Sequence, residues 1–235
     1  MGIVFGVTGS EEPAYELVAD RPGYQIRHYP AYFVAEVDTG SLENSNKAFG
    51  YLARYIGVFG TPENTLQHQE GTKAPESLAM TAPVIMEPKP SKLAMTAPVI
   101  MEPNQKSSKM AMTSPVINEQ DSSGDQVMQF VLPFHLKSMD EVPVPTNPVV
   151  KVRHVPEKII ACNRFSGQAS EMRFEAKRNS LIGDIIKDNI LQEPEKYEYS
   201  VAQYHPPFTL GPLRRNEIWL KIPLTLAQVK AKLPK

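Results

Sequence analysis

Two short segments with an Arg-His-x-Pro pattern carry the clearest coordination chemistry in the sequence. They are Arg27-His28-Tyr29-Pro30 and Arg153-His154-Val155-Pro156. A neutral imidazole is a common metal ligand, but a lone histidine is a weak metal signal. His28 is therefore interpreted either as a metal ligand or as a strand residue with a solvated ring. His154 is its counterpart, and an ordinary surface position is the favoured interpretation there. The other three histidines, His68, His135 and His205, show no mutual spacing that suits a metal.

Sulfur ligands are the second candidate chemistry, because six of the ten methionines lie between positions 80 and 112. Thioethers bind soft metals such as copper(I). Methionine is more often a flexible filler of irregular apolar space, so packing is the favoured interpretation. The single cysteine, Cys162, lies in a strand-like apolar run and is predicted to be a buried small residue, not a nucleophile.

The composition limits the classes of partner. Hydrophobic residues make up 41% of the chain, and the formal net charge is −1 with Lys and Arg dispersed. A nucleic-acid partner is not expected, because phosphate backbones are bound by clustered cations. One cysteine excludes an intrachain disulfide and fits a reducing compartment. No apolar run reaches about 18 residues, so no membrane span is expected, and the N-terminus lacks secretory or transit-peptide character. A cytoplasmic protein is the expectation.

The elements that must position these side chains occur in the same order twice. Each Arg-His-x-Pro is predicted to end a strand, because proline lacks the amide hydrogen that continues a ladder. A second strand follows at 32–37 and at 159–162. An apolar stripe at helical spacing comes next in each half. The two stripes are Phe49, Leu52, Ala53 and Ile56, and then Phe174, Leu181, Ile182, Ile185 and Ile186.

Capping residues and further strands complete the two halves. Asn44 or Ser45 is expected to cap the first helix and Gly57 to end it, while Ser170 and Asn189 bound the second. More strands are predicted at 127–132, 198–204 and 217–222. This order predicts an α+β fold: a pseudo-duplicated antiparallel sheet with two helices packed on it.

A proline-rich repeat interrupts the first half. The ten residues Ala79 to Pro88 recur without change as Ala94 to Pro103, and a looser copy runs from Ala111 to Ile117. The copies are too few for a solenoid. Each is predicted to be a short edge strand, with one copy in the main sheet and the other two in a protruding loop. A second proline-rich segment, Asp140 to Pro148, is predicted to join the halves as an extended, semi-rigid connection.

Five segments in order make the sequence resemble the SOUL heme-binding protein family. They are Tyr24 to Pro30, Ala53 to Gly57, Ala79 to Val84, Phe130 to Pro133, and the C-terminal Tyr204 to Phe208 with Arg214 to Trp219. The resemblance covers roughly residues 13–223. It is strongest for plant-type cytosolic members, which begin with a similar Met-Gly-x-Val-Phe-Gly and also repeat the Met-Thr-Ala-Pro block.

The resemblance implies a distorted antiparallel barrel of two pseudo-symmetric halves, each with a helix on its outer face. It also implies reversible binding of heme or free porphyrin against an apolar face near the first helix. The site residues that it implies are His28, Lys47, Phe49, Leu52, Ala53, Arg54 and Ile56. Among these, Arg54 and Lys47 meet propionates, and His28 is the candidate axial ligand of heme iron. Some members carry a lysine where this chain has Thr209-Leu210-Gly211, so Lys47, Arg214 or Arg215 would have to replace it.

Three functions are weighed for this sequence. The first is a non-enzymatic carrier or buffer of heme or a related tetrapyrrole. It is expected to be a single domain over residues 1–235, with halves at about 13–139 and 149–223 and a Met/Pro-rich insertion at about 79–117. The second is a protein-interaction module that presents the repeat to a protein partner. The third is a hydrolase that uses Glu217, because the wider fold superfamily includes hydrolases with buried acids. No catalytic motif supports it, and an enzyme is not expected.

Overall fold

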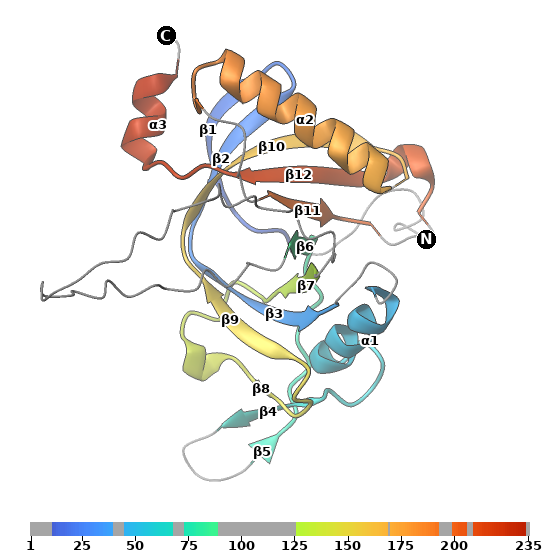
Figure 1. Ribbon diagram of the computed structural model, residues 1–235. Coiled ribbons are helices and arrows are strands. Elements are labelled where there is room, and N and C mark those ends of the chain that lie inside the picture. The colour runs from blue at the N-terminus through green and yellow to red at the C-terminus, as the bar shows by residue number, and fades with distance from the viewer. Residues whose placement is uncertain are drawn as a thin grey trace, which may run out of the picture.

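The computed structural model describes residues 11–39, 45–67, 73–88, 126–168, 170–192, 199–205 and 209–233. In this part of the chain, one antiparallel sheet curls into a half-barrel, and helices pack against it (Figure 1). Its strand order is β1-β2-β10-β12-β11-β6-β7-β3-β9. A small second sheet has the order β5-β4-β8.

The elements have the following bounds: β1 (Glu16–Arg21), β2 (Tyr24–Tyr29), β3 (Tyr32–Asp38), α1 (Ser45–Ile56), β4 (Asn64–Gln67), β5 (Lys73–Ala74), β6 (Val84–Pro88), β7 (Gln126–Val131), η3 (Met139–Glu141), β8 (Val144–Pro145), β9 (Lys151–Val155), β10 (Lys158–Ser166), α2 (Glu171–Lys187), β11 (Tyr199–Gln203), η4 (Gly211–Leu213), β12 (Arg215–Lys221) and α3 (Leu226–Lys232). The predicted α+β class and the repeated order of strands and helices are confirmed. The helix α3, the strand β1 and the small sheet were not predicted.

The two halves exchange their first strands. The first half contributes β2, β3, α1, β6 and β7, and the second contributes β9, β10, α2, β11 and β12 in the same order. Strand β2 nevertheless pairs with β10 of the second half, and β9 pairs with β3 of the first. The halves meet again where β6 pairs with β11. Each half therefore completes the other half's part of the sheet.

The predicted helices form where their apolar stripes and end signals place them. Helix α1 packs on β3 and β7, and α2 packs on β10 and β12. Gly57 ends α1 with a φ of 89°, and a Cβ there would come within 2.7 Å of the Pro62 side chain, so glycine is required. Asn189, with a φ of 56°, follows α2. Ser170 is the N-cap residue as predicted, but its side chain makes no capping hydrogen bond.

Strand alternation separates two faces of the sheet. On β2, Tyr24 and Ile26 belong to the large core under the helices, which defines the helix-covered face. Arg27 and Tyr29 alternate with them, and Tyr29 lies in a smaller apolar cluster with Trp219 on the opposite face. Both faces are buried here, so polar groups on the opposite face require partners within the protein.

The first copy of the repeat lies in the main sheet, as predicted. Its strand β6 pairs with β11 on one side and β7 on the other, so it is an interior strand and not the edge strand that was expected. Met86 is buried in the core, which confirms packing for that methionine. The copies at 94–103 and 111–117 lie outside the described residues. The proline-rich connection forms the short helix η3 and the strand β8, which pairs with β4.

Candidate functional site

The predicted apolar face of α1 is turned toward the sheet. Leu52, Ala53 and Ile56 are each at most 2% exposed and lie in the core beneath the helix. These three residues therefore anchor α1 on β3 and β7, and any ligand at this helix has to use the side chains around them.

Three of the predicted residues are accessible on the same helix. Lys47 and Arg54 are exposed, and Phe49 is half-buried with its ring centroid 5.2 Å from that of Phe130. The Arg54 guanidinium lies 5.8 Å from the centroid of the half-buried Tyr51 ring. Lys47, Tyr51 and Arg54 recur at helical spacing on the exposed side of α1, whereas Phe49 packs against the core beside Phe130. The exposed side thus combines one aromatic ring with two cations, a set that suits a flat apolar ligand bearing acid groups.

His28 lies on β2, which pairs with β1 and β10, whereas α1 packs on β3 and β7. Its Nδ1 atom is 3.7 Å from Glu16 Oε2, and its Nε2 atom is 3.5 Å from Glu157 Oε2. The structure therefore does not place His28 among the predicted α1 residues. An iron bound by His28 would have to displace one of these carboxylates. The counterpart His154 is exposed, with its ring centroid 5.3 Å from that of Phe33.

A buried carboxylate forms the densest polar cluster on the opposite face. Glu217 is fully buried and binds Arg27 through an Nη1–Oε2 contact of 3.0 Å and Arg215 through an Nη2–Oε1 contact of 2.8 Å. The Tyr204 hydroxyl and the Trp219 indole N–H also donate to Oε2, at 2.9 and 2.8 Å. Sequence reasoning missed this cluster. The alternation of Arg215, Glu217 and Trp219 along one strand face was the available signal.

The partners of Glu217 fix its charge. Burial alone would raise its pKa, but the charges of Arg27 and Arg215 and the donated hydrogen bonds outweigh that effect and lower the pKa to about 2. Burial also raises the pKa of the neighbouring Cys162 well above its ordinary value. Cys162 is 2% exposed, which confirms the predicted buried thiol. Glu217 is thus a permanently ionised structural group.

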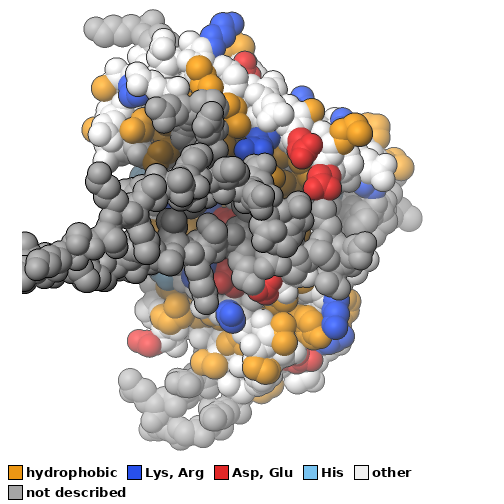
Figure 2. Space-filling view, in the orientation of Figure 1, with side chains coloured by type: hydrophobic (Ala, Val, Ile, Leu, Met, Phe, Trp, Pro, Cys, Tyr) orange, Lys and Arg blue, Asp and Glu red, His pale blue; other side chains and the backbone are white. Residues whose placement is uncertain are grey.

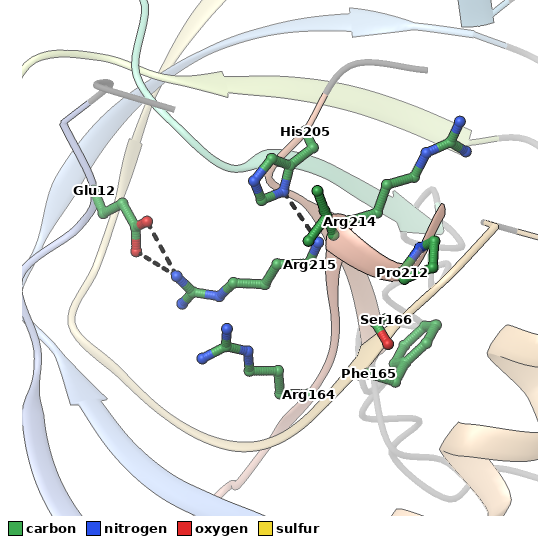
Figure 3. A pocket seen from close by; sticks show the side chains of 9 residues that line it. Glu12, Arg164, Phe165, Ser166, His205, Pro212, Arg214 and Arg215 are labelled. Carbon is green, nitrogen blue, oxygen red and sulfur yellow. Dashed lines mark hydrogen bonds and ion pairs between the residues drawn. The ribbon is translucent and has the colours of Figure 1, made fainter. Parts of the chain in front are cut away.

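A polar cavity of about 530 Å³ adjoins this cluster where β10 ends and β12 begins (Figure 3). Its lining residues are Glu12, Arg164, Phe165, Ser166, His205, Pro212, Leu213, Arg214 and Arg215. The His205 Nδ1 atom accepts the backbone N–H of Arg215 at 3.0 Å, which holds the start of β12 in place. The cavity is therefore built from the second half of the chain together with Glu12.

On the face in Figure 2, basic, acidic and apolar side chains of the described residues are interspersed. Among those residues, no group of three or more His, Cys, Asp or Glu side chains could hold a metal ion. None of the described helices has the length and apolar character needed to cross a membrane.

Comparison with known proteins identifies the family. The family model described as SOUL heme-binding protein matches residues 10–103 and 97–221. The chain belongs to the SOUL heme-binding protein family. The match includes all of the main-sheet strands, both long helices and the cavity-lining residues. A tetrapyrrole is therefore the small-molecule partner that family membership supports.

Solved structures resemble this SOUL protein only distantly, and no curated protein matches it in sequence. The C-terminal domain of EcmrR has 9% identity and a TM-score of 0.44, with 90% of this chain and 99% of that one covered. A hydrolase encoded by lin2189 of Listeria innocua has 11% identity and a TM-score of 0.49, with coverages of 86% and 92%. These low scores support no statement about the ligand or activity of this SOUL protein.

Proposed function

We propose that the protein binds heme or a related tetrapyrrole reversibly and acts as a carrier or buffer without chemical turnover. The observation that carries this proposal is the SOUL family match, which extends over both halves of the chain. Such a role requires an accessible apolar surface with cations at its border, and it requires no reactive group.

The exposed side of α1 is the proposed binding surface. Tyr51 offers its ring to a porphyrin face, Lys47 and Arg54 can pair with its propionates, and Phe49 lies at the core side of the helix. Leu52, Ala53 and Ile56 act from below by fixing the helix on the sheet. A porphyrin face buries several hundred Å² of apolar surface, and at ~25 cal/mol per Å² this allows roughly micromolar affinity without an iron bond.

His28 is the proposed axial ligand of a heme bound at β2, which is a different position from the α1 surface. Its ring is partly accessible, with 23% of the side chain exposed, but both ring nitrogens face carboxylates. Iron ligation at Nε2 would displace Glu157, whose own side chain is 75% exposed and can move into solvent. Because α1 does not contain His28, ligation and apolar binding can be tested separately.

The state of Glu217 supports the absence of turnover. A general acid needs a proton to donate near neutral pH, and a general base needs a pKa near the working pH. Glu217 has a pKa of about 2 and no exposed surface, and Arg27, Arg215, Tyr204 and Trp219 occupy its oxygens. It therefore does not fit the role of a hydrolytic acid or base.

The experiment is a hemin titration of the purified protein followed by absorbance. We expect a saturable, red-shifted Soret band at micromolar hemin. Arg54→Gln should weaken binding about three- to fivefold, because an exposed ion pair contributes up to ~1 kcal/mol. Lys187→Gln is the matched control, since Lys187 occupies the last turn of α2 as Arg54 does in α1. Absence of saturable binding, or equal weakening in the control, would contradict the proposed site.

His28→Ala separates iron ligation from apolar binding. If His28 ligates iron, this variant loses the red shift with hemin and binds metal-free protoporphyrin like the wild type. An unchanged hemin spectrum in the variant would rule out His28 as the axial ligand and leave an apolar porphyrin surface.

A further inference from the structure

The cavity where β10 ends and β12 begins has an excess of positive charge among its lining residues. Three arginines, Arg164, Arg214 and Arg215, line it together with one carboxylate, that of Glu12. Figure 3 shows Arg164 and Arg215 extending into the same space, with Glu12 on the far side of Arg215. Clustered guanidinium groups in a recess attract anions, because the surrounding protein screens charge less than water does.

Arg215 is already neutralised from two sides. Its Nη1 atom lies 2.9 Å from Glu12 Oε2, and its Nη2 atom lies 2.8 Å from Glu217 Oε1. The Arg214 Nε–H donates to the Thr209 carbonyl at 2.7 Å, which orients that side chain. Arg164 is therefore the lining arginine to consider as an anion contact.

Arg164 lies beside the Glu217 carboxylate, whose oxygens already accept hydrogen bonds from other side chains. In the β10–β12 register, Arg164 is directly opposite Glu217. The oxygens of Glu217 accept from Arg27, Arg215, Tyr204 and Trp219 instead. Arg164 is exposed and has no hydrogen-bond or ion-pair partner among the described residues. Its five donors are thus available to a ligand.

The remaining lining residues limit the kind of anion. Phe165 and Leu213 supply an apolar wall, and Leu213 is 42% exposed. A volume of about 530 Å³ lies within the usual range of small-molecule sites. These features suit a compact organic acid with an apolar part more than a bare ion.

We propose that this cavity binds a small organic anion through its carboxylate or phosphate groups, with Arg164 as the residue that meets the acid group. Guanidinium groups bind both kinds of acid through paired hydrogen bonds. The cavity lies on β10, β12 and η4, whereas α1 packs on β3 and β7. This site is additional to the tetrapyrrole surface and does not depend on it.

The test uses the full chain in solution NMR, with citrate in one titration and inorganic phosphate in another at constant ionic strength. The reporters are the arginine Nε–H resonances and the indole N–H of Trp219, the single tryptophan. Saturable shifts should give a dissociation constant of about 1 mM or below for citrate, and weaker binding for inorganic phosphate, which has no carbon skeleton to contact Phe165 and Leu213. Arg164→Gln should weaken it at least ~tenfold, or ~1.4 kcal/mol. Arg164→Lys should retain part of the affinity, and Lys187→Gln should leave it unchanged.

Several outcomes would overturn this proposal. One is the absence of saturable shifts with either acid, and another is equal weakening by Lys187→Gln, which would indicate a general charge effect. A hemin titration tests whether the two sites are independent. If hemin displaces citrate, and if Arg164→Gln weakens hemin binding, the cavity is the tetrapyrrole site and a separate anion site is refuted. Two sites would be supported if only Arg54→Gln weakened hemin binding and only Arg164→Gln weakened citrate binding.

Discussion

The same Arg-His-x-Pro motif has two different environments in the two halves of this molecule. Arg27 pairs in register with Ile160 on β10, and Arg153 pairs with Val34 on β3, so the two arginines occupy equivalent strand positions. The Arg27 side chain is 4% exposed and bound to the fully buried Glu217. The Arg153 side chain is 41% exposed and bound to Glu36 at 2.9 Å. The two arginines therefore share a backbone position, but one forms a buried ion pair and the other a partly solvated one, so the two pairs differ in their contribution to stability.

The partners differ as well as the burial. Around Glu217, the Trp219 indole and the Tyr204 hydroxyl complete a water-excluded cluster. Around Arg153, Glu36 and Glu87 both remain partly exposed, at 18% and 27%, and Gln129 donates to each of them. A buried ion pair is indispensable once formed, because removal of one partner leaves an uncompensated charge. A solvated pair contributes little.

Among the changes that test this comparison, Arg27→Met should have the largest effect on the free energy of unfolding. It leaves Glu217 buried with Arg215 as its only cation, and we expect a loss of about 3 kcal/mol in the free energy of unfolding. Urea denaturation at neutral pH measures it. A loss below ~1 kcal/mol would show that Arg215 alone compensates Glu217, and the difference between the halves would then not be energetic.

The second largest effect should come from acid, which should reduce the stabilisation that ionised Glu217 contributes. The unfolded Glu217 carboxyl has an ordinary pKa of 4.5, and the folded one has a pKa of about 2. Since the unfolded chain takes up the proton first, the stabilisation is complete above about pH 4.5 and is lost as pH falls toward about 2. Unfolding free energies measured across this window should decline more steeply for the wild type than for Glu217→Gln. Parallel declines would contradict this assignment.

Arg153→Met should produce the smallest effect. Its ion pairs with Glu36 and Glu87 lie at a partly solvated site, so the loss should be no more than ~1 kcal/mol and should shrink further at high salt. The measurement is the same urea denaturation, with and without added salt. A loss equal to that of Arg27→Met would remove the contrast between the two halves.

The exchange of strands β2 and β9 between the halves is relevant to whether the chain forms a single domain. Because β2 completes the sheet of the second half and β9 that of the first, neither half presents a full set of paired strands by itself. On this ground we predict that the chain folds as one unit. The strand exchange could not be predicted from periodicity, which identifies a strand but not its neighbour.

Sequence reasoning succeeded where the signal was local. Gly57 and Asn189 end the helices that were predicted, and Pro30 and Pro156 follow the strands that end before them. It was less informative about the site. The apolar stripe of α1 was assigned to a ligand, yet an apolar stripe at helical spacing serves equally to bury the helix on its sheet, and Leu52, Ala53 and Ile56 do so.

The sequence by itself determined the family, the pseudo-duplicated α+β order and the burial of Cys162, because motifs, periodicity and turn residues act over a few neighbouring positions. Only the tertiary structure decided which charges meet. Arg27 and Glu217 are separated by 190 positions and join across strands β2, β10 and β12. Because the oxygens of Glu217 accept from other side chains, Arg164 does not pair with it and instead lines the cavity. Such pairings depend on strand order and register, which local sequence patterns do not encode.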